Sequence, residues 1–75
     1  MNPLLKKRSM NLAGHGTSLA LEPEFWAVLE AWASAEGASL AGLVGRIDAS
    51  RGERPLASAC RVAALERAAE AAVPV

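Results

Sequence analysis

Few residues of this 75-residue chain have side chains suited to catalysis, and their spacing forms no catalytic motif. The single histidine, His15, lies between two glycines, which suits a turn better than a general base. Cys60 lies among Ala and Val in a stretch with helical character, where a cysteine is typically a small buried hydrophobe. One Cys and one His also fall short of the about four ligands of a structural zinc site. The sequence therefore predicts neither enzymatic activity nor a cofactor or metal site.

Basic residues near the N-terminus indicate a different chemistry, the neutralisation of phosphate. Lys6, Lys7 and Arg8 give residues 1–21 a charge of +3, whereas residues 22–75 carry five Arg against eight acids and therefore −3. A polyanion would meet the N-terminal segment first. Because a strong DNA binder makes about six to ten phosphate contacts, a basic tail that is simply solvated is the alternative interpretation.

Two segments of alternating residues are expected to position this charge. Over 8–13 and 17–21, apolar residues alternate with polar or small ones, which predicts two strands that each bury one face. The dipeptide Gly14-His15 between them predicts a two-residue type II′ turn, with Leu12 opposite Thr17. In that register the polar face of the hairpin contains Lys7, Ser9, Asn11, Ser18, Ala20 and Glu22.

Helical signals follow the strands. The predicted helices cover residues 23–36, 39–51 and 56–72. Pro23 suits the first position of a helix, and Gly37 suits the left-handed residue that ends one. Ser39 is placed to cap the second helix. The third helix is rich in Ala and has few large apolar residues, which suggests that it packs on a partner.

The small size of the chain limits the core that one copy can build. A domain of this length buries only about 60–65% of its unfolded surface, and 17 of its residues are Ala. With neither a disulfide nor a metal expected, oligomerisation is the usual remedy, so we expect a homodimer in which strand 17–21 pairs with its copy. The predicted dimer core contains Leu19, Leu21, Phe25, Trp26, Leu43, Val44 and Ile47.

One domain is expected over residues 1–75, with residues 1–6 as a basic arm. No stretch approaches the roughly 20 apolar residues of a membrane span. The basic residues are not followed by the apolar run of a signal peptide. We therefore expect a cytoplasmic protein without a membrane partner.

Two modes of DNA recognition are compatible with these elements. The short joint Gly37-Ala38-Ser39 permits a helix-turn-helix, in which the second helix reads base edges. The exposed face of that helix is a poor reading surface, because it offers only Ala41, Gly42, Gly45, Arg46 and Asp48. In the second mode, two copies of strand 17–21 pair antiparallel across a two-fold axis and present their outer side chains to the major groove, and the strand pattern favours it.

The order of strand, helix, Gly-x-Ser joint and helix resembles the ribbon-helix-helix family, in particular a bacterial branch of short members. The resemblance spans residues 7–66 and is carried by the motifs Lys7-Arg8-Ser9, Gly14-His15-Gly16-Thr17-Ser18, Leu21-Glu22-Pro23-Glu24-Phe25-Trp26, Ile47-Asp48-Ala49-Ser50-Arg51 and Leu56-Ala57-Ser58-Ala59-Cys60-Arg61. It implies a mainly α homodimer with a short β-ribbon, here extended by an N-terminal hairpin strand and a third C-terminal helix.

The resemblance also implies a function, that of a transcriptional regulator that binds double-stranded DNA. Phosphates would be held at the start of the second helix, by Ser39 and Leu40. The candidate DNA contacts are Lys6, Lys7, Arg8, Ser9, Asn11, Ser18 and Ala20.

Some features of the chain do not match a DNA-reading ribbon. Gly16 and Ala20 carry no side-chain donor, and Glu22 would approach phosphates with the wrong sign. Two hairpins side by side would form a sheet roughly 15–19 Å wide, broader than a major groove of about 12 Å. The alternative function is therefore a protein-interaction or assembly module on the same dimer fold.

Overall fold

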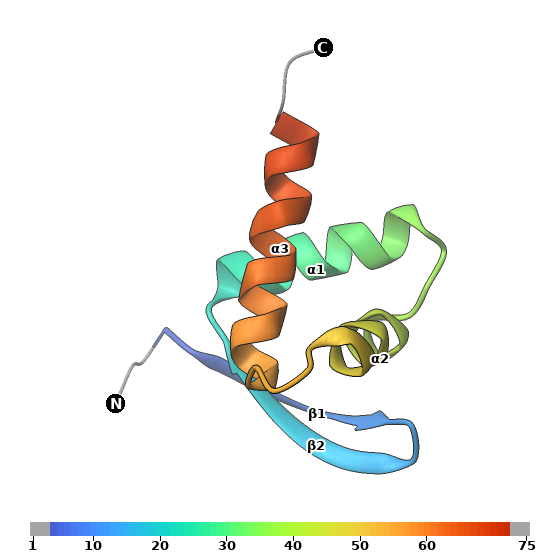
Figure 1. Ribbon diagram of the computed structural model, residues 1–75. Helices are drawn as coiled ribbons and strands as arrows, with labels where there is room; N and C mark the ends of the chain where they lie inside the picture. Colours follow the sequence, from blue (N-terminus) through green and yellow to red (C-terminus); the bar gives the residue numbers. More distant parts are fainter. Residues whose placement is uncertain (1–3, 73–75) are drawn as a thin grey trace.

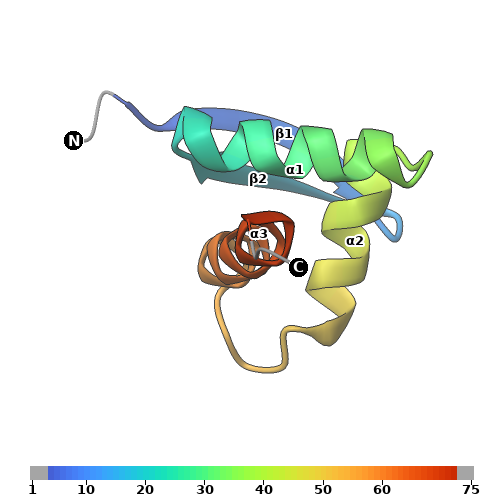
Figure 2. The same ribbon diagram turned by 90° about the horizontal axis from the view of Figure 1, so that it is seen from above.

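A computed structural model describes residues 4–72 of the chain (Figure 1). Its elements are the strands β1 (Lys6–Leu12) and β2 (His15–Leu21) and the helices α1 (Pro23–Ala35), α2 (Leu40–Ser50) and α3 (Leu56–Ala72). The strands form one antiparallel hairpin, and the three helices lie on the same face of it (Figures 1 and 2). The predicted fold class, mainly helical with a short β-ribbon, is confirmed.

The turn of the hairpin differs from the predicted one. Ala13 and Gly14 form it, with φ values of 52° and 85°, as a type I′ turn requires. Leu12 therefore lies opposite His15 instead of Thr17. A turn moved by one residue shifts every cross-strand pair by two positions and leaves each side chain on its face. The alternation in the sequence thus predicts the faces but cannot distinguish the two registers.

Element boundaries shift slightly as well. Both strands begin two residues earlier than predicted, because the turn lies one residue earlier, so that β2 starts at His15 and its last residue, Leu21, pairs with Lys6. The second helix is shorter than predicted at each end, since Ser39 and Arg51 are its caps. The first helix ends one residue early, and the third has the predicted bounds. Of the predicted arm at 1–6, residues 1–3 lie outside the described part and Lys6 opens β1.

A single core fills the space between the hairpin and the three helices. It consists of Leu12, Leu19 and Leu21 of the hairpin, Trp26, Leu29 and Ala33 of α1, Leu43, Val44 and Ile47 of α2, and Ala59, Cys60 and Ala64 of α3. The small residues of α3 allow it to pack closely against its neighbours. Six of the seven residues predicted for the dimer core are buried within this one chain, and Phe25 packs against them partly buried.

β1 gives β2 its hydrogen-bonded neighbour within the same chain. Lys6 pairs with Leu21 at one end of the hairpin and Leu12 with His15 at the other, so every residue of β2 has a partner in β1. The sequence-based argument for a homodimer required a partner strand for β2, in this chain or in a second copy. The chain itself provides such a partner, β1, along one edge of β2, and in this two-stranded sheet the other edge of β2 remains open to a second copy.

Candidate nucleic-acid interface

Six residues of the hairpin share the face that is turned away from the helices. They form three cross-strand pairs, Lys7 with Ala20, Ser9 with Ser18, and Asn11 with Gly16. We call these six residues the outer face. The alternate residues, among them the buried Leu12 and Leu19, lie on the other face, against the helices. The predicted division of the hairpin into an apolar and a polar face is therefore present.

Hydroxyl and amide groups occupy the middle of the outer face. Ser9 and Ser18 face each other, with 3.5 Å between their Oγ atoms, and both side chains are exposed. Asn11 is exposed beside Gly16, where an added Cβ would meet nothing within 4 Å. This part of the hairpin also borders a shallow hollow of about 460 Å³. The surface can donate and accept hydrogen bonds, and Lys7 is its single charged side chain.

Arg8 is not part of the outer face. It pairs with Leu19 on the helix side of the hairpin, where its guanidinium lies 4.7 Å from the centroid of the Trp26 ring. The Nη2 atom of the guanidinium is 3.5 Å from Oε1 of Glu30. Trp26 in turn donates its Nε1–H to the carbonyl oxygen of Lys6 at 2.8 Å. Arg8 and Trp26 therefore fasten β1 to α1, and the charge of Arg8 is balanced within the chain.

Glu22 is likewise neutralised. The Nε–H of Arg61, on α3, donates to Oε1 of Glu22 at 2.9 Å. This hydrogen bond lowers the pKa of the Glu22 carboxyl below its ordinary value. The two residues are 39 positions apart in sequence, so no local pattern announces the pair. The negative charge of Glu22, which was expected to repel phosphate, is thus neutralised by Arg61.

The predicted phosphate site at the start of α2 has the geometry of an N-terminal cap. The backbone N–H of Gly42 donates to Oγ of Ser39 at 3.0 Å. A Cβ at position 42 would approach the same oxygen to 3.0 Å, which accounts for the glycine. The amides of the first helical turn, that of Leu40 included, have no partner inside the helix. α2 packs against β1, so these amides and the hairpin belong to one rigid unit.

Comparison with known families identifies this arrangement. A family model described as a ribbon-helix-helix domain matches residues 5–68. The chain belongs to the ribbon-helix-helix family. Members of this family generally dimerise and bind DNA. No curated protein and no solved structure gives a match.

The ribbon-helix-helix match includes both strands and most of α3. β1 and α3 therefore belong to the domain that the family model describes, whereas the sequence pattern led us to expect both as additions to it. The family resemblance inferred from the motifs is confirmed. The individual contacts to DNA and phosphate stay predictions.

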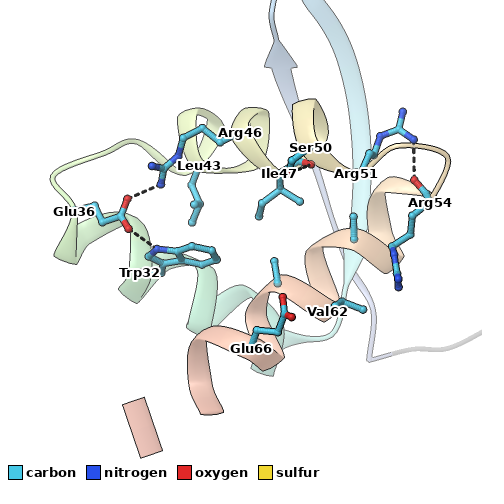
Figure 3. A pocket seen from close by; sticks show the side chains of 12 residues that line it. Trp32, Glu36, Leu43, Arg46, Ile47, Ser50, Arg51, Arg54, Val62 and Glu66 are labelled. Atoms are coloured by element: carbon cyan, nitrogen blue, oxygen red, sulfur yellow. Dashed lines mark hydrogen bonds and ion pairs between the residues drawn. The ribbon is translucent and has the colours of Figure 1, made fainter. Parts of the chain in front are cut away.

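A groove between the three helices was not predicted. It has a volume of about 540 Å³, and Leu43, Ile47 and Val62 are among the residues that line it (Figure 3). At one end, the Nε1–H of Trp32 donates to Oε2 of Glu36 at 2.7 Å, and Arg46 binds the other carboxylate oxygen. The hydrogen bonds from Arg46 and Trp32 lower the pKa of the Glu36 carboxyl below its ordinary value, and the bond from Arg46 has the larger effect. The cluster ties α1 to α2 in this ribbon-helix-helix chain.

Over residues 4–72, no three or more His, Cys, Asp or Glu side chains form a group that would hold a metal ion. Cys60 is fully buried, and burial raises the pKa of its thiol to about 11, so it is protonated at neutral pH. None of the described helices is both long and apolar enough to cross a membrane.

Proposed function

We propose that this protein is a small dimeric regulator of transcription in the bacterial cytoplasm, and that it contacts double-stranded DNA with the outer face of its hairpin. The observation that carries the proposal is the outer face itself. In a family whose members generally bind DNA, it exposes Lys7, Ser9, Asn11 and Ser18 together, while the large apolar side chains of the hairpin point inward.

A single hairpin has the width that a major groove admits. Two strands lie about 4.8 Å apart, and a two-stranded ribbon enters a groove about 12 Å wide. Pairing of β1 with β2 supplies both strands from one chain. We therefore propose that each hairpin enters the groove by itself, which avoids the four-stranded sheet that would be too broad.

Each predicted contact has a distinct role in this proposal. Lys7 neutralises a phosphate at the edge of the ribbon, and Lys6, which is also exposed, adds a second charge nearby. Asn11 has the amide that pairs with the N6 and N7 atoms of adenine. Ser9 and Ser18 donate to base edges or sugars, and Ala20 leaves room for close approach. The first amides of α2, next to Ser39, receive a phosphate oxygen.

Binding to a DNA fragment from upstream of the protein's own gene, measured over a series of salt concentrations, tests the proposal. We expect binding to weaken as salt rises, and the magnitude of the slope to fall by about 1.8 for the Lys7→Ala dimer, which is about 0.9 for each protomer if each Lys7 neutralises one phosphate. Arg8→Ala is the matched control, because it removes the same formal charge from a residue already bound to Glu30 and Trp26. No measurable affinity at low salt would refute DNA binding.

A protein-interaction or assembly module is the second candidate function. The groove favours it, because an apolar floor that includes Leu43 and Ile47 lies beside the charged Arg46 and Arg54. Retention of the dimer together with no DNA affinity would support this function in place of the first.

A further inference from the structure

The groove between the three helices has the size of a small-molecule site. One stripe of side chains on α2 and one on α3 form its walls, and they consist of Leu43, Arg46, Ile47 and Ser50, and of Ala59, Val62, Ala63 and Glu66. Each stripe covers about two turns of helix, so the groove is about 11 Å long. Its volume of about 540 Å³ lies within the roughly 300–1,000 Å³ of ordinary ligand pockets.

The floor of the groove is apolar. Leu43, Ile47 and Ala59 are buried there, and Val62 is partly exposed beside them (Figure 3). An apolar body that lies over these side chains removes apolar surface from water, which is favourable in proportion to the area covered. Since these side chains offer no hydrogen bonds, the groups at the two ends of the groove must orient a ligand.

The two ends of the groove differ in charge. Arg54, in the loop between α2 and α3, lies at one end, and its guanidinium takes part in none of the ion pairs among residues 4–72. Glu36 and Glu66 lie toward the other end, and Val62 separates Glu66 from Arg54 (Figure 3). Arg46 binds Glu36, whereas Glu66 belongs to no ion pair of the described residues. An unpaired cation and an unpaired carboxylate therefore flank the apolar floor.

We propose that the groove binds an amphipathic monoanion, with a carboxylate at one end of an apolar body about as long as two turns of helix. The carboxylate pairs with Arg54, because the planar guanidinium presents donors that match both carboxylate oxygens. The apolar body covers Ile47 and Val62 and ends beside the indole of Trp32. A phosphate head fits less well, because one cation balances a single charge and a phosphate carries nearly two.

Glu66 gives the site a direction. A ligand with a second carboxylate at its far end would bring that group toward Glu66 and Glu36, where like charges repel. The site is therefore expected to distinguish a monocarboxylate from a dicarboxylate of the same length. A neutral molecule of that length retains the apolar contact and loses the ion pair with Arg54.

This site goes beyond the proposed function. Its walls are on the helices, whereas the candidate DNA contacts of the hairpin, such as Lys7, lie on the outer face, which is turned away from the helices. Binding of the anion and binding of DNA are therefore measured separately, and each proposal can fail without the other.

Titration with octanoate, followed by nuclear magnetic resonance of the two indole N–H groups, tests the site. Trp32 lines the groove, whereas Trp26 is 2% exposed in the core, so we expect the Trp32 signal to shift and the Trp26 signal to stay. Octanol lacks the charge and octanedioate has a carboxylate at each end, so each should bind at least about threefold more weakly than octanoate. A Trp32 signal that does not shift, or equal affinities for the three compounds, would overturn the proposal.

Substitution of Arg54 separates the ion pair from the apolar contact. Arg54→Gln is expected to weaken octanoate binding by about three- to tenfold and to leave octanol binding unchanged. Lys7→Gln is the matched control, because it removes the same charge from the outer face of the hairpin. Glu66→Gln should raise the affinity for octanedioate more than that for octanoate. Unchanged octanoate binding by Arg54→Gln would overturn the assigned ion pair and the proposal with it.

The same experiment detects another occupant of the groove. If a second copy covers it, the Trp32 signal shifts on dilution of the protein and not with octanoate, and the proposal fails. A protein that binds octanoate but no DNA retains this site and loses the proposed function. A protein that binds DNA while its Trp32 signal ignores octanoate shows the reverse.

Discussion

At the scale of single residues, the charges of this protein are arranged so that the hairpin's outer face keeps only Lys7. Arg8 is balanced by Glu30 and stacks on Trp26, and Glu22 is balanced by Arg61. Both ion pairs are partly exposed, so each contributes little to stability. Their main effect is to hold the side chains in position. Under the proposed function, specificity comes from hydrogen bonds, since the single cation of the outer face supplies mainly orientation.

The Asn11→Ala variant, which removes the side-chain amide, tests whether a hydrogen bond from the outer face gives specificity. We expect Asn11→Ala to weaken binding to the preferred DNA by the equivalent of about 1–3 kcal/mol and to reduce discrimination against a changed A·T pair. The salt slope should not change, because no phosphate contact is lost. Competition titrations with single-base-pair variants measure both effects. If the substitution weakens binding equally for all DNA sequences, Asn11 contacts the DNA backbone and not a base.

The buried thiol of Cys60 predicts a pH dependence of stability. Burial raises its pKa from 9.0 to about 11 in the folded protein, whereas the unfolded chain loses the proton near 9.0. The folded state therefore holds more protons between these values, and its stabilisation, complete below pH 9, is lost as pH rises toward 11. A shift of this size corresponds to about 2–3 kcal/mol. Urea unfolding from pH 8 to pH 11 should show the loss.

Cys60→Ala is the control for this pH dependence. The substitution lowers stability at every pH because it removes buried volume, but the decline between the two pKa values should become shallower. An unchanged decline would mean that the Cys60 thiol does not cause the pH dependence.

At the scale of elements, the hairpin shows which features of the fold the sequence pattern predicts and which it does not. Alternation predicts both strands and which residues share a face, because side-chain period and burial are local properties. It does not predict the register, since the turn at Ala13 and Gly14 needs two positive φ values, which Ala rarely adopts. The ties from Arg8 to Glu30 and from Arg61 to Glu22 join distant segments, so they depend on the tertiary fold and have no local signal.

Glycine substitutions in the hairpin test the turn. Gly14 has φ +85° and Gly16 does not require a positive value, although both have open space where a Cβ would lie. Gly14→Ala is therefore expected to lower the free energy of unfolding by about 1–2 kcal/mol through backbone strain alone. Gly16→Ala, the matched control, should change stability by less than about 0.5 kcal/mol or raise it slightly. Equal urea midpoints for the two variants would contradict the type I′ turn.

At the scale of the whole molecule, the central finding is that one chain closes its own core. β1 pairs with β2, and the helices bury Leu19, Leu21 and Trp26 without a second copy. An intertwined dimer shares its core between chains and often has no folded monomer. Here these core residues are buried within one chain, so folding and association are expected to be separable.

Unfolding at different protein concentrations measures that separation. For a dimer, dilution weakens stability by mass action, so the urea midpoint of the unsubstituted protein should fall as concentration falls from 100 to 1 µM. The transition should remain cooperative at the lowest concentration, because one chain buries the whole core. Leu19→Asp, which buries a charge at a position only 3% exposed, should unfold at every concentration. Loss of the cooperative transition of the unsubstituted protein on dilution would mean that a second copy is needed to complete the fold.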